Sequence, residues 1–400
     1  MKTKVSIALL STAMCFDVSL AADNITDAIT SGKSSVDMRL RYESVEQDNS
    51  LQDASAMTLR SRISYATGEY KGFSATLGME DVRIVGGEDE YSMPLTGFNP
   101  GVYSVIADPE VTEVDQGFIK YSSGMTEVKY GRQVITYDNQ RFVGHVGWRQ
   151  DRQTYDGLRV SVSPADNLKV DYSYISKRNR IFAEAVDVDS KDNLLNVSYK
   201  SSFGTLSGYA YLLEIDNNTN NALDTYGLRL IGSTGANDQY SYSLEYASQE
   251  SESGATKSDA DYILAEGAMK FSGMTAKLGY ELLGSDDGTY GFSTPLATVH
   301  LFNGWTDQFL ATPNQGLVDL YVSLGGKFAG GKWLAVYHDF SADESTATID
   351  DLGDEINILY ARKFGKVYTG GIKYGSYSAG DAAAGKVDTD KLWVWGEMKF

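Results

Sequence analysis

The chain has almost no cysteine: among its 400 residues, Cys15 is the only one. Cys15 falls inside an N-terminal segment, residues 1–21, that has the features of a cleaved signal peptide. Because cleavage would remove the only thiol, we expect the mature protein to have no disulfide and no cysteine chemistry. The sequence therefore excludes disulfide-stapled folds and thiol enzymes.

The signal segment follows the usual order of its parts. Lys2 and Lys4 precede an apolar run, as the positively charged region of a signal peptide does. Ser19 and Ala21 then supply small residues at the −3 and −1 positions of a cleavage site. We predict cleavage after Ala21, with Ala22 as the near alternative.

Long apolar runs are missing from the remaining residues, 22–400. A membrane-spanning helix needs roughly 18 or more consecutive apolar residues, and no such run follows the signal segment.

Proline is also scarce, at 6 residues, whereas glycine (40) and tyrosine (27) are abundant. This balance favours many short strands with tight turns and interfacial tyrosines. A closed barrel would use the whole length as one domain.

The last residues of the chain alternate between two kinds of side chain. One face carries Leu392, Val394, Gly396, Met398 and Phe400, and the other carries Lys391, Trp393, Trp395, Glu397 and Lys399. Successive side chains of a strand point to opposite faces, and in an outer-membrane barrel these faces meet lipid and lumen. A strand that ends on an aromatic residue also resembles the insertion signal that outer-membrane proteins present to the barrel assembly machinery.

The same alternation recurs in segments of roughly 9 to 13 residues, the length of a tilted membrane strand. The clearest apolar series are Val36/Met38/Leu40/Tyr42, Met57/Leu59/Ile63/Tyr65, Leu158/Val160/Val162, Leu168/Val170/Tyr172/Tyr174, Tyr240/Tyr242/Leu244/Tyr246, Met274/Ala276/Leu278/Tyr280 and Val318/Leu320/Val322/Leu324. The phase is ambiguous near Val114, Ala260 and Trp333. We predict an all-β fold: a transmembrane antiparallel β-barrel of about 18 strands over residues 35–400, after a short periplasmic segment, 22–34.

The connections between these segments alternate between short and long. Short ones lie near Gly68, Ser123, 164–167, Ser202, Thr234, Ser272, Gly330 and Gly365, and long ones near Asn49, 87–110, 138–153, 177–192, Asn217, Ser251, 284–315, Asp343 and Asp381. Short periplasmic turns and longer external loops are typical of bacterial outer-membrane barrels, whereas a soluble sandwich or a β-helix has no reason to keep this order. We expect an integral protein of a Gram-negative outer membrane with both termini in the periplasm.

The net charge of −19 is unevenly distributed. Acidic residues gather in the long loops, where they either bind divalent cations or stay solvated. Arginines instead fall on the inward phase of the strands, at Arg39, Arg41, Arg60, Arg62, Arg159 and Arg229. In one interpretation they make a partly electropositive lumen that attracts anions. In the other, inward carboxylates such as Asp37, Glu43 and Glu245 neutralise them.

Two long loops have a composition that is unusual for solvated loops. The first, 137–153, contains Arg141, Phe142, His145, Trp148, Arg149 and Arg152. We expect it to fold into the barrel and narrow the pore, with aromatic rings packed on the wall and guanidinium groups facing the passage. The second loop, 293–310, is also rich in aromatic residues, which can stack on sugar rings. The alternative for each residue is packing without ligand contact.

These two loops resemble signatures of the alginate-export family of outer-membrane porins. The stretches that carry the resemblance are 138–150, 153–157 and 296–305, and the segments 39–42 and 58–63 look like the family's first two strands. The resemblance implies a barrel of similar strand count and passive passage of solute without covalent chemistry.

The sequence does not indicate an enzyme. Its three histidines are His145, His300 and His338. A barrel could bring the two loop histidines close to Asp138 or Asp307, but no nucleophile is marked by a turn motif or an adjacent base. Zinc, calcium and phosphate-loop motifs are absent, and no basic run of the nucleic-acid-binding type occurs. We expect no cofactor, no metal and no nucleic-acid partner.

We therefore predict a monomeric outer-membrane channel for passive diffusion of small hydrophilic solutes, preferentially anionic ones such as acidic oligosaccharides or organic acids. One alternative is a dedicated exporter of an alginate-like polysaccharide, and another is a plugged structural or adhesive barrel. Besides the solute, the expected partners are outer-membrane lipid, lipopolysaccharide and the barrel assembly machinery. The expected pore-lining residues are Arg39, Arg41, Arg60, Arg62, Arg141, His145, Trp148, Arg149, Arg152, Arg159 and Arg229.

The alternation that ends on Phe400 predicts that this residue is required for assembly. Deletion of Phe400, or the substitution Phe400→Asp, should leave the protein in the periplasm, because the assembly machinery would no longer recognise its last strand. The protein should also lose its heat-dependent shift on a gel. A normal amount of either variant in the outer membrane would contradict the prediction.

Overall fold

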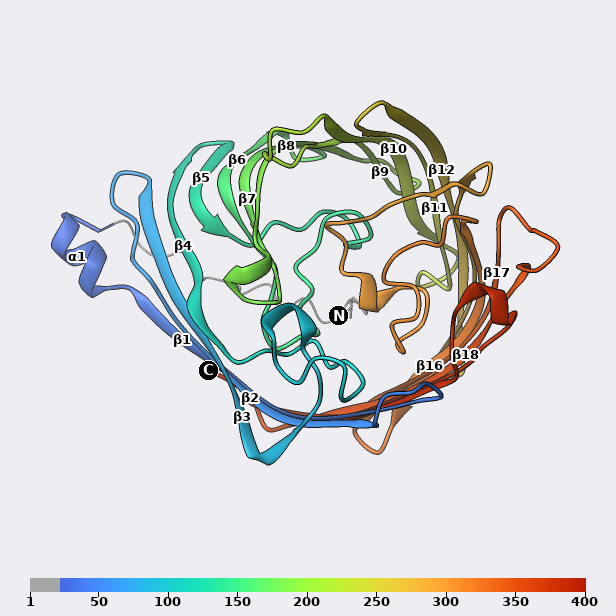
Figure 1. Ribbon diagram of the computed structural model, residues 1–400. Helices are drawn as coiled ribbons and strands as arrows, with labels where there is room; N and C mark the ends of the chain where they lie inside the picture. The colour runs from blue at the N-terminus through green and yellow to red at the C-terminus, as the bar shows by residue number, and fades with distance from the viewer. Residues whose placement is uncertain (1–21) are drawn as a thin grey trace.

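The computed structural model describes residues 22–400, and the predicted signal peptide, 1–21, lies outside them. Its main element is one antiparallel sheet of 18 strands that closes on itself (Figure 1). The first strand, β1 (Lys33–Gln47), pairs with β2 (Ala54–Ala66) on one side and with the last strand, β20 (Thr389–Lys399), on the other. The prediction of a barrel of about 18 strands is confirmed.

The other barrel strands each pair with the barrel strands before and after them in the chain. They are β3 (Phe73–Glu90), β4 (Val111–Ser123), β5 (Thr126–Gln133), β6 (Thr154–Ala165), β7 (Leu168–Asn179), β8 (Val188–Lys200), β9 (Thr205–Leu213), β10 (Asn221–Thr234), β11 (Tyr240–Ser253), β12 (Thr256–Phe271), β13 (Met274–Leu283), β16 (Leu317–Phe328), β17 (Gly331–Ser341), β18 (Asp351–Phe364) and β19 (Tyr368–Ser378).

A few short elements lie outside the barrel wall. They are the helix α1 (Ile25–Thr30), the two-stranded hairpin β14 (Ser285–Asp286) and β15 (Tyr290–Gly291), and the 3₁₀ helices η1 (Pro94–Thr96), η2 (Glu184–Val186), η3 (Val299–Leu301) and η4 (Ala382–Ala384). Within residues 22–400, no helix has the length and apolar character needed to cross a membrane. The first strand begins at Lys33, two residues before the predicted start of the barrel.

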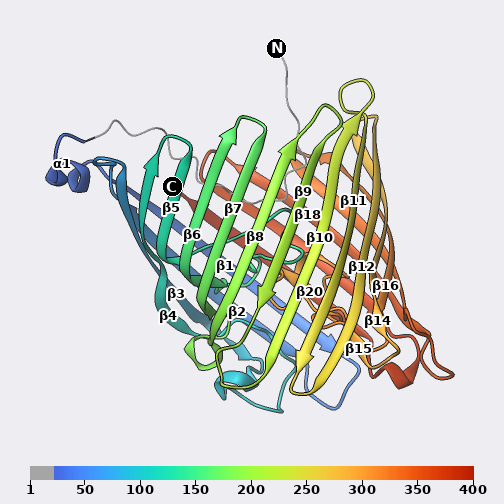
Figure 2. The same ribbon diagram turned by 90° about the horizontal axis from the view of Figure 1, so that it is seen from above.

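Short and long connections separate to opposite ends of the barrel (Figure 2). We call these the turn end and the loop end, and the start of β1 and the end of β20 both lie at the turn end. One predicted long loop, near Ser251, is wrong: only Gly254 and Ala255 connect β11 to β12. The reason is that the hydrogen-bonded ladder continues to the pair Ser253 and Thr256, so β11 and β12 include the residues that were expected to form the loop.

The two faces of the wall have opposite character. On β11, the outward Leu244 and Tyr246 are about half exposed, at 49% and 50%, whereas the inward Ser243, Glu245 and Ala247 are buried. A soluble protein would bury the first set, because burying apolar surface stabilises the fold. An apolar outer face and a polar interior are instead typical of a barrel in a membrane.

A bulge in β4 explains the ambiguous phase near Val114. Gly78 pairs with Gln116 and Met79 pairs with Val114, so Asp115 is an extra residue without a partner in the ladder. A bulge shifts the alternation of side chains by one position. It turns Asp115 inward, where its side chain is only 4% exposed.

The barrel closes through the last residue of the chain. The Phe400 N–H donates to the Val36 carbonyl at 3.0 Å, and the Val36 N–H donates to the Phe400 carbonyl at 2.8 Å. Phe400 itself is 64% exposed.

The separation of turns and loops predicts which insertions are accessible on cells. If the loop end faces outward, antibody should reach an epitope tag inserted at Gly87, Gly254 or Asp381 on intact cells. A tag at Gly330, in the turn between β16 and β17, should be labelled only after the outer membrane is permeabilised. Equal labelling at Gly330 and Gly254 on intact cells would contradict this orientation.

Candidate functional site

Two long connections lie inside the ring of strands (Figure 1). We call them inner loop 1, residues 134–153 between β5 and β6, and inner loop 2, residues 292–316 before β16. The Gly144 N–H donates to the Leu296 carbonyl at 2.8 Å, and the Thr298 N–H donates to the Gln140 carbonyl at 3.0 Å. The two loops therefore support one another through their backbones.

An aromatic cluster fixes one side of inner loop 1 to the wall. Phe142 contacts Tyr209 of β9 at a centroid distance of 5.3 Å and Tyr262 of β12 at 5.1 Å. Phe292 of inner loop 2 packs on the same ring at 5.8 Å. Tilted and edge-on contacts of this kind add to the gain from burying the rings, which confirms that the aromatic residues of this loop pack against the wall.

Hydrogen bonds fix the other side of inner loop 1 to β1 and β2. The Arg39 guanidinium donates to the Trp148 carbonyl at 2.8 Å and to the Gln150 Oε1 at 2.9 Å. Arg62 donates to the Gln150 carbonyl at 3.0 Å, and the Gln150 amide donates to the Thr58 carbonyl at 3.1 Å. The loop is thus held between two distant parts of the wall.

Arg149 lies at the centre of a buried charge network. Its guanidinium donates to Glu43 of β1 at 3.0 Å and to Asp307 of inner loop 2 at 2.8 Å. Lys391 of β20 donates to the same carboxylate of Asp307 at 2.9 Å. Burial lowers the pKa of Arg149, but Glu43 and Asp307 outweigh burial, so its pKa lies above the ordinary value. Both loops are therefore tied to the wall by charge.

A second cation, Lys373 of β19, lies beside this network. Its ammonium group donates to the His300 Nε2 at 2.6 Å, and the His300 Nδ1–H donates to Asp307 at 2.6 Å. Burial lowers the pKa of His300 to about 3, so the ring is neutral near pH 7 and can accept this bond. Three indole rings surround the ammonium group, with centroids at 4.0 Å (Trp305), 4.4 Å (Trp148) and 5.1 Å (Trp393).

Carboxylates of the wall also hold both inner loops. Arg141 of inner loop 1 donates to Glu281 of β13 at 2.7 Å and to the Asn303 side chain at 3.0 Å. Glu355 of β18 accepts from the Thr306 N–H at 3.0 Å and from the Thr306 hydroxyl at 2.6 Å. These bonds satisfy polar groups that are closed off from water.

The arginines expected to line the pore are mostly covered and paired. The ion pairs are Arg41 with Asp108, Arg60 with Asp37, Arg62 with Glu80, Arg152 with Asp115, Arg159 with Asp171 and Arg229 with Glu245. Arg141 and Arg149 are 2% and 5% exposed, because the two inner loops cover them. Their guanidinium groups contact carboxylates and do not face the passage, as we had predicted they would. Among residues 22–400, no carboxylate lies within ion-pair distance of Arg39.

The loop histidines also have local partners. His145 is half-buried and bonds to the Gln140 Oε1 at 2.7 Å, not to Asp138. His300 forms a hydrogen bond with Asp307, one of the two carboxylates that we considered as its partner. In the described part of the chain, no three His, Cys, Asp or Glu side chains are grouped so as to hold a metal ion.

A row of cations on the inner face of β4, β5 and β6 contains the predicted Arg159 and two lysines that we had not predicted. Lys120 is directly opposite Lys129, and Lys129 is directly opposite Arg159. Their side chains are 31%, 25% and 16% exposed, so they remain in contact with water. Glu127 is 3.3 Å from Lys129 and 3.8 Å from Lys120. The inward phase of the strands could have identified both lysines.

Comparison with known proteins agrees with this architecture. A family model described as alginate export matches residues 27–286. Similar solved structures include OccAB1 of Acinetobacter baumannii (13% identity, TM-score 0.69, 96% of this chain and 99% of that chain) and, from Pseudomonas aeruginosa, OpdO (10%, 0.71, 94% and 98%) and OpdK with vanillate (13%, 0.66, 93% and 99%). At these identities the likeness shows the fold alone, a closed antiparallel β-barrel. No curated protein sequence matches the chain.

The charge network predicts that Arg149 holds inner loop 1 in place. Arg149→Gln should lower the free energy of unfolding by about 3 kcal/mol, because it leaves buried carboxylates with one cation fewer. It should also expose inner loop 1 to proteases. Urea unfolding in lipid vesicles and limited proteolysis would measure the two effects.

Arg83→Gln is the matched control, because the Arg83–Asp81 ion pair is exposed, at 47% and 39%. It should change the free energy of unfolding by less than about 1 kcal/mol. If inner loop 1 of the Arg149 variant resists proteases as well as the wild type does, the network does not hold the loop.

Proposed function

Because the chain belongs to the alginate export family, we propose that it is an outer-membrane channel through which small hydrophilic solutes diffuse, with a preference for anions. The channel would have both termini in the periplasm and act as a monomer. The barrel assembly machinery would insert it after removal of residues 1–21. No step of this function requires covalent chemistry.

The observation that carries the proposal is the row of Lys120, Lys129 and Arg159 on the inner face. These cations are partly exposed inside a low-dielectric wall, where the field of like charges is focused and raises the local concentration of anions. Glu127 offsets only part of the charge, because it is shared between the two lysines. The arginines, Arg159 included, contribute less than the two lysines, since each lies against a carboxylate or carbonyl group.

The proposed solutes are small organic acids or acidic oligosaccharides. OpdK, one of the similar structures, was solved with vanillate, which is an aromatic carboxylate. Lysine and arginine side chains bind carboxylates through charge-assisted hydrogen bonds. A solute of that size would meet the exposed cations while passing the two inner loops.

A dedicated exporter of an alginate-like polysaccharide is the second candidate. A hydrated polymer needs a wide, continuous passage, whereas here two loops cross the interior and are tied to several strands. Release of both loops would break the bonds of Arg149, Arg141 and Glu355. A plugged structural or adhesive barrel is the third candidate, and a conductance measurement separates it from the other two.

We expect the purified protein to conduct ions in a planar bilayer and to select for anions. The double variant Lys120→Gln/Lys129→Gln should move the reversal potential in a salt gradient toward cations, because Glu127 then faces the passage without its partners. The shift should be large at 0.01 M salt and small at 1 M, where the screening length falls from about 30 Å to about 3 Å.

The double variant Lys191→Gln/Lys257→Gln is the control. It removes the same charge from side chains near the loop end that are 47% and 63% exposed and lie outside the lumen. Its reversal potential should match that of the wild type. A wild-type protein that inserts but does not conduct would favour the plugged barrel, and equal selectivity in both double variants would refute the role of the cation row.

A further inference from the structure

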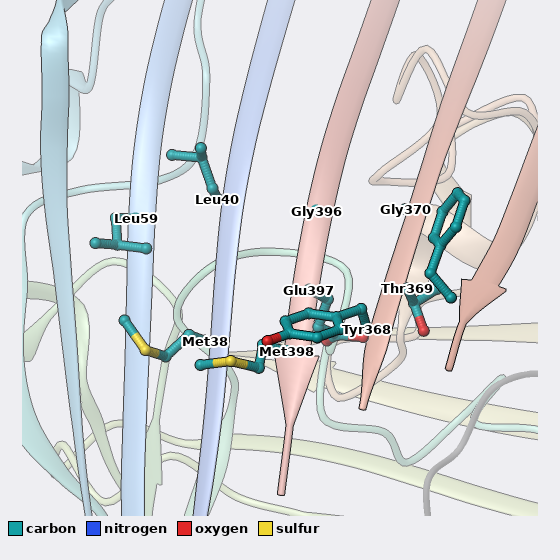
Figure 3. Close-up of a pocket in the computed structure, with 10 residues that line it drawn as sticks. Met38, Leu40, Leu59, Tyr368, Thr369, Gly370, Gly396, Glu397 and Met398 are labelled. Atoms are coloured by element: carbon teal, nitrogen blue, oxygen red, sulfur yellow. The ribbon is translucent and has the colours of Figure 1, made fainter. Parts of the chain in front are cut away.

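The outer face of the barrel carries a groove of about 380 Å³ that the channel function does not use. It lies where β19, β20, β1 and β2 are adjacent, near the turn end (Figure 3). Its floor is formed by Gly370 and Gly396, which are directly opposite each other in the ladder. Leu40 is opposite Gly396 and Leu59 is opposite Leu40, so two leucines form one side.

The backbone gives no reason for glycine at either floor position. Neither residue has a positive φ, the conformation that favours glycine over other residues. A Cβ on Gly396 would have no atom within 4 Å, and a Cβ on Gly370 would meet its nearest atom at 3.5 Å. Glycine inside a strand weakens the strand and often marks a bulge, a tight bend, or a close approach by a ligand or another backbone, and the ladder has no bulge at these two residues. Here it leaves room that a side chain could fill.

Large side chains border the groove toward the turn end. Tyr368 is opposite Met398, and Met398 is opposite Met38. Figure 3 shows these three side chains side by side below Gly370 and Gly396. Phe364 completes the border and is 52% exposed. The groove is therefore a bounded apolar hollow, continuous with the apolar outer face of the barrel.

A cation stands at the edge of the groove. Arg362 is directly opposite Gly370, and its guanidinium lies 5.2 Å from the centroid of the Phe364 ring. Among residues 22–400, no carboxylate lies within ion-pair distance of Arg362. The sequence from 356 to 380 contains no Asp or Glu but does contain Lys363 and Lys366, in a chain with 54 acidic residues. Glu397 also lines the groove, but its carboxylate is paired with Arg60 at 3.4 Å and Lys399 at 2.9 Å, so the edge at β18 is locally basic.

We propose that this groove is a binding site for an anionic phospholipid of the leaflet at the turn end. One acyl chain packs over Gly370 and Gly396, and the phosphate accepts hydrogen bonds from Arg362, with Lys366 nearby. Arginine presents a planar fork of donors that suits a phosphate group, and basic residues at a membrane surface attract anionic lipids. The proposal rests on the placement of the barrel in the outer membrane and not on the solutes that pass through it.

Phosphatidylglycerol and phosphatidylethanolamine with identical acyl chains are the probes. The wild-type protein, purified in detergent and mixed with both, should retain one phosphatidylglycerol by native mass spectrometry. Gly396→Leu should abolish this retention, because the leucine side chain would occupy the groove. Arg362→Gln should reduce the preference for phosphatidylglycerol by about fivefold, the effect of one basic residue at the membrane surface, whereas Arg362→Lys should keep most of it.

Gly267→Leu is the matched control, because Gly267 is also exposed on the barrel wall with open space in front of its Cβ. It should retain the lipid as the wild type does. Each variant is first checked for the heat-dependent gel shift and for unchanged conductance, so that failure of the channel function is separate from failure of the lipid site. Unchanged retention in Gly396→Leu, or an equal loss in Gly267→Leu, would overturn the proposal. A dimer that Gly396→Leu dissociates would instead assign the groove to a second copy.

Discussion

Closure of the backbone ladder is the constraint on which the rest of this structure depends. The hydrocarbon interior of a membrane offers no hydrogen-bond partner, so every strand must pair on both sides. The pairing of β1 with β20, completed by Val36 and Phe400, removes the last open edge. Once the sheet is closed, its apolar side chains face outward, and the interior has to be built from polar groups and loops.

The interior meets this requirement by pairing charges across elements that are far apart in the chain. An isolated buried charge is costly, and a buried ion pair is tolerated only when additional hydrogen bonds satisfy its remaining polar atoms. Arg149 has two carboxylates, and Asp307 has three donors. This network fixes the positions of the two inner loops. The cations on β4 to β6 lie outside it and remain in contact with water.

The alternation of apolar residues was sufficient to predict the strands, their number and the two ends of the barrel. It was insufficient where the local pattern is broken, as at Asp115, because one extra residue reverses the phase without leaving a distinct sequence signal. The composition of inner loop 1 predicted that it folds inward, but its partners are not local: Arg39 and Gln150 are separated by 111 positions. The inward phase of β4 and β5 could have identified Lys120 and Lys129. Whether an inward cation is covered depends on distant contacts, so the sequence could not show that these two lysines stay exposed while Arg141 and Arg149 are buried.

The anchoring of inner loop 1 on both sides of the barrel has a kinetic consequence. The loop bonds to β1 and β2 and packs on β9 and β12, so its contacts require these parts of the sheet to face each other across a formed lumen. We therefore expect such contacts to form at the end of folding and to be weak or absent in the transition state. Interactions of this kind slow unfolding without speeding folding. The two inner loops should thus also prolong the lifetime of the assembled barrel.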